Sequence, residues 1–414
     1  MSSSDTIVSL DIGTSKVRAI IGELSGGTIN IIGVGSADSE GIRKGSIVDI
    51  DQTVQSIRSA IDHAERMVGI QISDVYVGIS GNHISLQSSH GVVAVSNEDR
   101  EIGEDDIVRV LQAAKVIALP PEREIIDVVP KQYVVDGLEG IHDPRGMIGV
   151  RLEVEAIIIT GAKTGIHNLR RVVDKAGLRC ADLVLMSLAS GHMALSKDEK
   201  SIGTILVDIG AGATTISVFE NGTIAATSTL PIGGDFITSD IAYGLHTQSD
   251  NAEKVKLKYG CAVIEDAAEE QQFRVPRIGS NVEKQFSQVD LANIIEPRVQ
   301  EIFQLVRAEV YRMGYGDAPG GYVLAGGSMS LPGMLTIAQL ELGVSVRTAT
   351  PDYIGVRDPS FVGGVGIIQF VSKSLRGRVT NARPKQAAVK QTAAVAAEKT
   401  GWFEKVKNFF SEFI

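Results

Sequence analysis

Short apolar runs separated by glycine turns open the chain. Residues 5–36 alternate such runs with turns, which predicts an antiparallel meander. Between residues 51 and 69, apolar positions recur every three or four residues, which predicts an amphipathic helix with Asp51 as its N-cap. A buried strand is then expected at 74–80. The pattern therefore predicts one mixed sheet with a covering helix.

The opening pattern returns in the middle of the chain. The segment VDIGAGATTISVF at 207–219 matches LDIGTSKVRAIIGEL at 10–24, because in each an acidic residue ends an apolar run and a turn of small residues leads into a second run. Gly-Thr-Ile follows both segments, at 27–29 and 222–224. Self-similarity of this size predicts two related halves that face each other.

Residues 83–161 break this rhythm and are interpreted as an insertion. A segment of this length can form a small core of its own. Within it we expect three strands and one acid-capped helix, near 84–95, 125–135 and 148–160 for the strands and near 104–118 for the helix.

The remaining pattern predicts more helices. They are expected at 163–176, 233–245, 249–260, 287–313 and 361–371. Ser249 and Asp250 are the expected caps of the third, and Pro297 must either kink the fourth or begin a new helix. The last is expected to pack tightly through its glycines. Residues 265–286 are polar and irregular, with one short strand.

The end of the chain differs in composition from the rest. From Arg378 to Thr400 it lacks core periodicity, which predicts a flexible linker. The segment 401–414 then places its large apolar side chains on one arc of about 140° of a helical wheel. These are Trp402, Phe403, Val406, Phe409, Phe410, Phe413 and Ile414. Such a helix fits a membrane surface, and the alternative is a groove on another protein.

Composition narrows the class of protein. Hydrophobic residues make up 43% of the 414 residues and charged residues 22%, which is typical of a globular chain. The net charge of -10 argues against a general nucleic-acid binder. No leader or long apolar run is present, so a cytosolic protein is expected. Cys180 and Cys261 are far apart and are expected to be core residues rather than a disulfide or metal ligands.

The repeated turns suggest a chemistry. A glycine turn after an acid-ended strand offers N–H groups to an anion such as phosphate. Two facing turns bring Asp11 and Asp208 together, where a divalent ion can neutralise their repulsion. A third glycine turn, at 325–333, is expected to support a base. Glu253 and Lys256, three apart on a helix, either reach the ribose or adenine or form a solvated ion pair.

Five motifs occur in the order found in the actin, Hsp70 and sugar-kinase superfamily. DIGTSKV, VDIGAGATTISV, LVLMSLASG, AEKVK and LAGGS resemble its phosphate-1, phosphate-2, connecting, nucleoside-binding and adenosine motifs. Within that superfamily, the insertion, SDIAYGL, EKVKLKYG, IIEPR and the terminal amphipathic segment resemble the FtsA family of bacterial cell-division actin homologues. The resemblance covers nearly the whole chain.

The resemblance implies an α/β, actin-like ATPase fold, with two duplicated halves around a nucleotide cleft and an inserted subdomain 1C in place of actin subdomain 1B. The implied boundaries are 1–82 and 162–201 for subdomain 1A, 83–161 for 1C, 202–240 and 302–377 for 2A with the closing helix of 1A, 241–301 for 2B, 378–400 for the linker and 401–414 for a membrane-targeting helix.

The resemblance also implies ATP and Mg²⁺ as cofactors. The residues expected to bind the nucleotide are Gly13, Thr14, Ser15, Lys16, Gly210, Ala211, Gly212, Ala213, Thr214, Gly234, Glu253, Lys256, Gly326, Gly327, Ser328 and Met329. Asp11 and Asp208 are expected to act in catalysis and to hold the metal through water. Asp182, nine positions before Gly191, matches the superfamily residue that orients the attacking water. Because aspartate is one methylene shorter than glutamate, slow hydrolysis is expected, with the nucleotide acting mainly as a structural switch.

The family's partners are implied in the same way. Such a protein polymerises, tethers the C-terminal peptide of the tubulin-like FtsZ to the cytoplasmic face of the membrane at the septum, and helps to recruit later divisome proteins. No nucleic-acid partner is expected. FtsZ is expected to dock on 241–301 through Lys284 and Arg298, with Arg274 and Arg277 as basic neighbours suited to an acidic peptide.

Two related functions compete with this interpretation. A pilus-assembly ATP-binding relative shares the insertion, but the terminal amphipathic segment argues against it. A small-molecule kinase of the superfamily needs a catalytic base between the halves, and no further aspartate motif suggests one.

Overall fold

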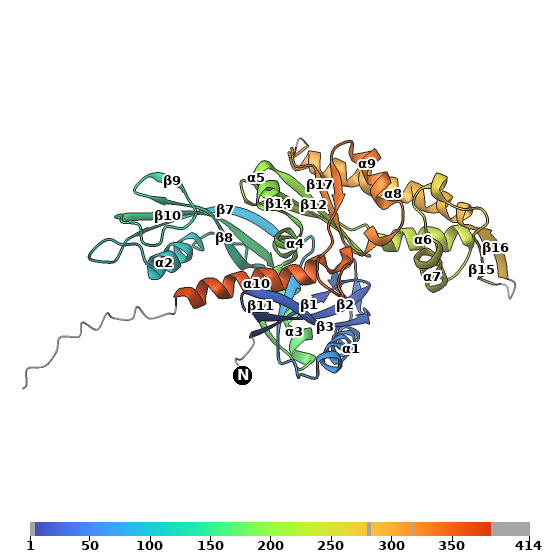
Figure 1. The fold of residues 1–414 in the computed structure, drawn as a ribbon, viewed down its shortest axis with the longest axis horizontal. Helices are drawn as coiled ribbons and strands as arrows, with labels where there is room; N and C mark the ends of the chain where they lie inside the picture. Colours follow the sequence, from blue (N-terminus) through green and yellow to red (C-terminus); the bar gives the residue numbers. More distant parts are fainter. Residues whose placement is uncertain (1–4, 280–282, 317, 382–414) are drawn as a thin grey trace, which may run out of the picture. The chain divides into compact units, whose positions relative to one another are not determined.

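The computed structural model describes residues 5–279, 283–316 and 318–381 (Figure 1). The chain divides into two compact units, Met1–Lys373 and Ser374–Ile414. Of the second unit, the structure describes residues 374–381.

The first half is built on a five-stranded sheet. Strands β1 (Asp5–Ile12), β2 (Lys16–Ser25) and β3 (Thr28–Asp38) form the expected antiparallel meander. Strands β6 (Asp74–Ile79) and β11 (Arg179–Leu185) extend it in parallel, giving the order β11-β6-β1-β2-β3. The mixed sheet predicted from the hydrophobic pattern is thus confirmed.

The second half repeats this sheet. Strands β12 (Thr204–Ile209), β13 (Thr214–Glu220) and β14 (Thr223–Leu230) form the meander, and β17 (Tyr322–Ala325) and β18 (Val346–Thr348) add to it in parallel. The order β14-β13-β12-β17-β18 is the same topology as in the first half. The duplication expected from the two glycine turns is therefore present in the fold.

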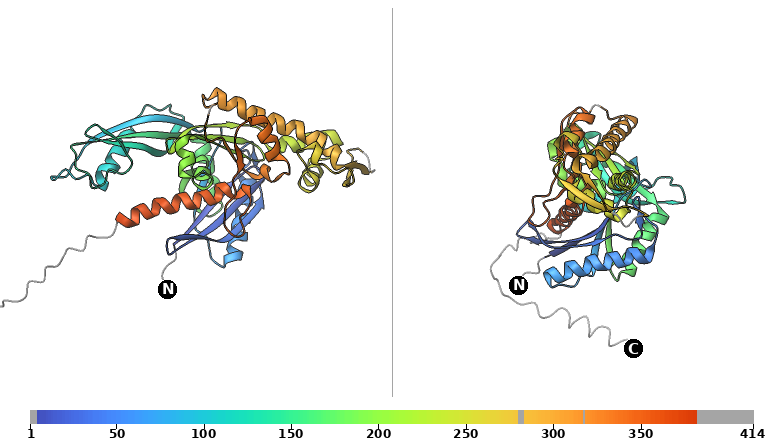
Figure 2. Two further views of the ribbon diagram at one scale, coloured as in Figure 1. Left: turned by 45° about the horizontal axis from the view of Figure 1, so that its top comes forward. Right: turned by 90° about the vertical axis from the view of Figure 1, so that its right-hand side faces the viewer.

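Helices α1 (Ile50–Val68) and α3 (Lys163–Lys175) pack on one face of the first sheet (Figures 1 and 2). The apolar stripe of α1 is buried against the strands, as its helical spacing predicts. The cap of α1 is Asp49 rather than Asp51, because the Asp49 carboxylate accepts a hydrogen bond from the N–H of Gln52 at 3.0 Å.

The inserted segment forms its own four-stranded sheet. Strands β7 (Ser85–Ala94), β8 (Arg123–Val135), β9 (Leu138–Ile141) and β10 (Arg151–Ala162) pair in the order β7-β10-β8-β9. Helix α2 (Glu104–Ala114) covers it and closes a separate hydrophobic core. The predicted small core is confirmed, and β9 is a strand that the sequence pattern did not predict.

A larger set of elements shares one hydrophobic core with the second sheet. They are α6 (Gly234–Leu245), α7 (Ser249–Tyr259), α8 (Gln288–Arg312), α9 (Met334–Leu342) and the hairpin β15 (Gln272–Pro276) and β16 (Glu283–Ser287). Helix α7 begins at Ser249, and no side-chain hydrogen bond caps it, so the expected caps are wrong. Pro297 lies inside α8 on its exposed side, and the helix continues through it. The region expected to hold one short strand contains this hairpin instead.

Helix α10 (Val362–Asn381) packs against α4 (Met186–Ala194) through its glycines. A Cβ atom on Gly366 would lie 2.2 Å from the backbone oxygen of Ala189, which is far inside contact distance. The expected tight packing of this helix is therefore confirmed.

Helix α10 also runs beyond the expected start of the linker. It ends at Asn381, so residues 378–381 are helical and the expectation of a linker there is wrong. The rest of the linker and the predicted helix at 401–414 lie outside the described residues. Within the described residues, no helix is long and apolar enough to cross a membrane.

Candidate functional site

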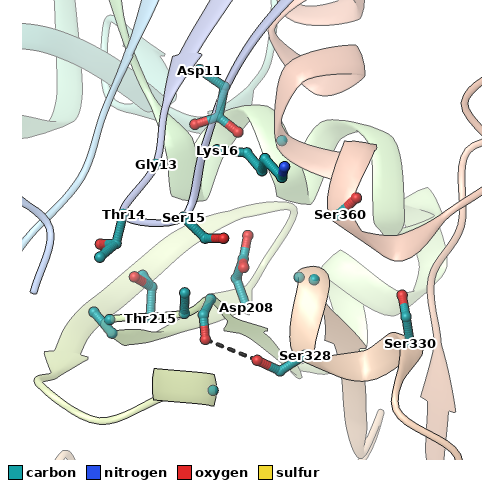
Figure 3. A pocket seen from close by; sticks show the side chains of 18 of the residues that line it. Asp11, Gly13, Thr14, Ser15, Lys16, Asp208, Thr215, Ser328, Ser330 and Ser360 are labelled. Atoms are coloured by element: carbon teal, nitrogen blue, oxygen red, sulfur yellow. Dashed lines mark hydrogen bonds between the residues drawn. The ribbon is translucent and has the colours of Figure 1, made fainter. Parts of the chain in front are cut away.

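A cavity of about 470 Å³ is lined by the turns that follow β1, β12 and β17. Its size is typical of small-molecule pockets, about 300–1,000 Å³. Figure 3 shows Thr14 and Ser15 of the first turn on one side of the cavity and Asp208, Thr215 and Ser328 on the other. The cavity thus receives residues from both halves.

The first two turns have the same geometry. The N–H of Gly13 donates to the oxygen of Lys16 at 3.1 Å, and the N–H of Gly210 donates to the oxygen of Ala213 at 3.0 Å. A Cβ atom on either glycine would lie only 3.0 or 3.1 Å from that same acceptor oxygen. Both turns therefore favour glycine at their first position, and glycine turns that line a cavity in this way suit an anion.

Asp11 and Asp208 end the two strands that lead into these turns. Burial raises the pKa of Asp11, and the charge of Arg18 partly offsets this effect. Burial raises the pKa of Asp208 to about 6, and the nearby Asp11 carboxylate adds to the shift. The two carboxylates therefore line the same cavity in a poorly solvated place, where a cation would stabilise their charged forms.

The residues present fit Mg²⁺ held together with a phosphate ligand. Asp11 and Asp208 supply two carboxylates, and within the described residues no group of three or more His, Cys, Asp or Glu side chains could hold a metal by itself. Mg²⁺ is commonly bound by one or two carboxylates, with substrate phosphates and waters completing its shell.

The third turn leaves no room for a side chain at Gly326. Gly326 has a φ of 94°, and a Cβ atom on it would lie 2.5 Å from a carboxylate oxygen of Asp208. The Ser328 hydroxyl donates to the backbone oxygen of Gly210 at 2.9 Å (Figure 3). The third turn is therefore fastened to the second, and its backbone forms part of the cavity wall.

Glu253 and Lys256 form a partly buried network rather than a solvated ion pair. The Lys256 ammonium lies 2.7 Å from the Glu253 carboxylate, and its side chain is only 12% exposed. It also donates to the Thr238 hydroxyl at 2.7 Å and to the oxygen of Gly234 at 3.1 Å. Both Glu253 and Lys256 line the cavity.

The structure brings most of the predicted nucleotide-binding residues together around this cavity. These are Gly13, Thr14, Ser15, Lys16, Gly210, Ala211, Gly212, Ala213, Gly234, Glu253, Lys256, Gly326, Gly327 and Ser328. The Lys16 ammonium also forms an ion pair with Asp38.

Two predicted residues point elsewhere. Thr214 is fully buried, and its hydroxyl donates to the oxygen of Ile232 at 2.7 Å, whereas the next residue, Thr215, lines the cavity. Successive side chains of a strand face opposite sides, so only one of the two threonines can reach the cavity. Met329 is 8% exposed and belongs to the core of the second half.

Asp182 is not brought to the cavity either. It is exposed on β11, where its carboxylate accepts a hydrogen bond from the N–H of Leu183 at 2.9 Å. The connecting segment reaches the cavity only where α4 begins, and it lines the cavity with Met186, Ser187 and Ser190. The expected role of Asp182 in orienting water therefore has no support in this geometry.

Arg18 is a cavity residue that sequence reasoning missed. It is the cross-strand partner of Asp11 on β2, and its guanidinium lies 5.1 Å from the centre of the Phe361 ring. The sequence could have indicated this residue, because a tight turn at residues 13–15 sets the strand register that pairs Asp11 with Arg18. Asp358, Ser330 and Ser360 also line the cavity.

The four basic residues expected to bind FtsZ do not form one cluster. Arg274, Arg277 and Lys284 are exposed, but Arg274 pairs with a glutamine and Lys284 with Val275, which places Arg274 and Lys284 on opposite faces of the hairpin. Arg298 is committed to ion pairs with Asp240 and Glu301. The predicted membrane-binding residues, from Trp402 onwards, lie outside the described residues.

Solved structures with similar folds come from several proteins. The PilM–PilN type IV pilus biogenesis complex matches with a TM-score of 0.62 and 18% identity, covering 90% of this chain and 98% of that one. MreB5 of Spiroplasma citri bound to ADP matches with a TM-score of 0.56 and 13% identity, covering 91% and 98%. These likenesses confirm the expected actin-like fold.

Family models and sequence relatives are more specific. A model described as "Cell division protein FtsA" matches residues 205–366, and one described as "SHS2 domain inserted in FTSA" matches residues 81–160. The cell division protein FtsA of Bacillus subtilis is 50% identical over 95% of this chain and 90% of its own length. That of Pseudomonas aeruginosa is 41% identical over 89% of each chain, and that of Escherichia coli is 34% identical over 89% and 90%. Since relatives this similar match it over almost its whole length, the chain belongs to the FtsA family of cell-division proteins.

Proposed function

We propose that this chain binds ATP with Mg²⁺ in the cavity between its two halves. The observation that carries the proposal is the pair of glycine turns with matching hydrogen bonds, which line one cavity together with Asp11 and Asp208. Glycine turns on both sides of the cavity suit a chain of phosphates. The carboxylates of Asp11 and Asp208 suit a divalent cation bound with those phosphates.

Different side chains are proposed to contact the phosphates and the nucleoside. When bound, Mg²⁺ would neutralise the phosphate oxygens and the two carboxylates together. Arg18 supplies a permanent positive charge on the same side as Asp11. Glu253 and Lys256, held in place by their shared contact with Thr238, are positioned for the nucleoside.

The nucleotide is proposed to act as a structural switch rather than as the fuel of rapid turnover. Where the connecting segment reaches the cavity, it presents Met186, Ser187 and Ser190, none of which is an effective base at neutral pH. Turnover in a steady-state phosphate-release assay should therefore be far below that of a metabolic kinase, and a rate in that range would contradict the switch.

The wider role proposed for the chain is that of a membrane tether in cell division. It would polymerise, hold the C-terminal peptide of FtsZ at the cytoplasmic face of the membrane at the septum, and help to recruit later divisome proteins. Membership of the FtsA family supports this role, as does the one-sided apolar pattern of residues 401–414. A pilus-assembly type of actin-like protein is the alternative, because PilM shares the fold.

The docking surface for FtsZ is proposed to wrap around the β15–β16 hairpin, because Lys284 and Arg274 lie on its opposite faces and Arg277 lies beside it. All three are exposed and project from or beside the β15–β16 hairpin, where an acidic peptide would meet positive charge. Arg298 is already paired with two carboxylates, so it would contribute only if those pairs were exchanged for peptide contacts.

Nucleotide binding is tested by titrating the purified chain with a fluorescent ATP analogue, with and without Mg²⁺. We expect tight binding that Mg²⁺ strengthens, and loss of the Mg²⁺ effect in Asp208→Asn. The matched control is Asp198→Asn, which removes an exposed carboxylate of the short helix α5 (Lys197–Ile202) outside the cavity. Absence of binding by the unmodified chain, or an equal Mg²⁺ effect in both variants, would contradict the proposal.

A further inference from the structure

A short hairpin reaches the cavity from the first half. Strands β4 (Ile42–Arg43) and β5 (Ser46–Ile47) pair with each other and form a small sheet of their own. Lys44 and Gly45 make the two-residue turn at the tip, and Gly45 lines the cavity. The hairpin is therefore an arm whose tip lies at the candidate nucleotide site.

The tip has an unusual backbone for a lysine. Lys44 has a φ of 49° and Gly45 a φ of 75°, the two positive values that a type I′ turn requires. Asparagine or glycine is the usual first residue of such a turn, because other side chains are strained in the left-handed region. A strained residue of this kind at a cavity is a reason to ask what its side chain contacts.

The backbone of the tip touches both phosphate-binding turns. The N–H of Gly45 donates to the Thr14 hydroxyl of the first turn at 3.1 Å. On the other side, a Cβ atom on Gly212 of the second turn would lie 3.1 Å from the Cα of Lys44 and 2.7 Å from the Thr14 hydroxyl. The arm from the first half thus closes directly on the turn of the second half.

The side chain of Lys44 continues across to the second half. Its ammonium lies 5.8 Å from the centre of the Phe236 ring on α6, within the range of a cation–π contact. Phe236 is well anchored, because it packs on the core of the second half and the Arg298 guanidinium lies 5.9 Å from the same ring centre. Arg298 is in turn paired with Asp240 and Glu301, which holds its guanidinium over the ring. The Phe236 ring is therefore a fixed contact for the Lys44 ammonium.

We propose that the hairpin of residues 42–47 is a strap that joins the two halves over the bound nucleotide, with the contact between Lys44 and Phe236 as its latch. The strap must lift before the nucleotide leaves, so the latch sets the rate of nucleotide release. This inference rests on the proposed nucleotide binding and adds to it a device that controls how long the nucleotide stays.

The sharpest test is the substitution Lys44→Asn. Asparagine before glycine is favoured in a type I′ turn, so the variant keeps or improves the hairpin while it removes the ammonium group. Release of a fluorescent ATP analogue from its Mg²⁺ complex, followed by stopped flow, should become about 3- to 10-fold faster, the range expected for one cation–π contact. Phe236→Leu should have a similar effect, and the double variant should be no faster than the single ones, because both changes remove the same contact.

Arg43→Gln is the matched control. It removes a positive charge from the neighbouring exposed position of the same hairpin, and Arg43 makes no ring or ion-pair contact among the described residues. Its release rate should equal that of the unmodified chain. Equal release rates in Lys44→Asn and the unmodified chain, or an equal acceleration by Arg43→Gln, would overturn the latch.

A second measurement judges the strap without any nucleotide. Hydrogen exchange of the peptide covering residues 41–49 should be faster in Phe236→Leu than in the unmodified chain, because the bond from Gly45 to Thr14 depends on the seated tip. Unchanged exchange there would count against the strap itself. Failure of the unmodified chain to bind nucleotide would instead defeat the proposed function, so the two failures can be told apart.

Discussion

Thr214 and Thr215 show how much depends on a single residue position. They are neighbours on β13, yet Thr214 lies in the core and bonds to Ile232, while Thr215 lines the cavity. The sequence shows that a pair of hydroxyls follows the glycine turn, but not which of them points inwards. That choice depends on how the pleat of the strand begins after the turn, which only the paired sheet determines.

The two threonines should respond in opposite ways to the isosteric change to valine. Thr215→Val should weaken ATP binding about 3- to 10-fold, the value of one hydrogen bond, and leave the unfolding free energy nearly unchanged. Thr214→Val should lower the unfolding free energy by about 1–3 kcal/mol, because the buried oxygen of Ile232 loses its donor. Binding titrations and denaturant unfolding measure the two effects, and the reverse assignment would show that Thr214 faces the nucleotide.

His192 should make the stability of the chain depend on pH. Burial, together with the nearby charges of Lys200 and Lys373, lowers its pKa from 6.5 to about 4. Between these values the unfolded chain binds a proton that the folded chain does not, so stability should fall as the pH drops from about 6.5 to about 4. Thermal melts at pH 8 and pH 5 should show a smaller loss in His192→Gln, and an equal loss in both proteins would contradict the assignment.

The contrast between Asp182 and Arg18 marks the limit of reading residues from motifs. Asp182 was chosen because it stands nine positions before Gly191. That spacing does not show where β11 ends and α4 begins, and in the structure Asp182 is an exposed residue of β11. Arg18 carries no motif of its own, although the antiparallel register pairs it with Asp11. The residues within the glycine turns were predictable, because each turn holds its own residues in a local geometry, whereas Thr214 and Met329, just beyond two of the turns, were not.

At the scale of elements, the packing of α10 carries a prediction. Alanine usually stabilises a helix by about 1 kcal/mol relative to glycine. In Gly366→Ala, however, the new methyl group would meet the backbone oxygen of Ala189, which cannot move aside as a side chain can. The variant should therefore be less stable, by about 1–3 kcal/mol, as expected for overpacking.

Gly103→Ala is the control for this substitution. A Cβ atom on Gly103 would have its nearest neighbour at 3.6 Å, an ordinary contact. Gly103 is the N-cap of α2, where alanine costs about 1 kcal/mol or less relative to glycine, so a larger fall in melting temperature in Gly366→Ala would be the sign of the clash. Equal melting temperatures would mean that α10 sits further from α4 than described.

Elements with strong periodicity were predictable, and short ones were not. The meanders, α1, the inserted core and α10 follow from apolar spacing over many residues. Of the hairpin β15–β16 only one strand was expected, and β9 was missed, because strands of four or five residues with polar faces carry little periodic signal. The cap of α1 was misplaced by two residues, since Asp49 and Asp51 are equally plausible caps from sequence alone.

At the scale of the whole molecule, duplication explains the position of the site. Two copies of one sheet each end in a glycine turn, and the copies face each other so that both turns meet at a single cavity. The nucleotide would then hold the halves in one relative position, with the β4–β5 strap across them. In this account, the bound state fixes the shape that enters a polymer, and many weak membrane contacts along the polymer add up through avidity.

Whether this chain tethers FtsZ to a membrane can be measured by liposome flotation. Labelled FtsZ C-terminal peptide is mixed with liposomes, Mg²⁺, ATP and the full chain, and the fraction that floats with the lipid is measured. If the chain is a membrane tether, the peptide should float with the full chain and stay behind when residues 401–414 are deleted. Equal flotation of the peptide with the full and the deleted chain, or no flotation with either, would contradict it.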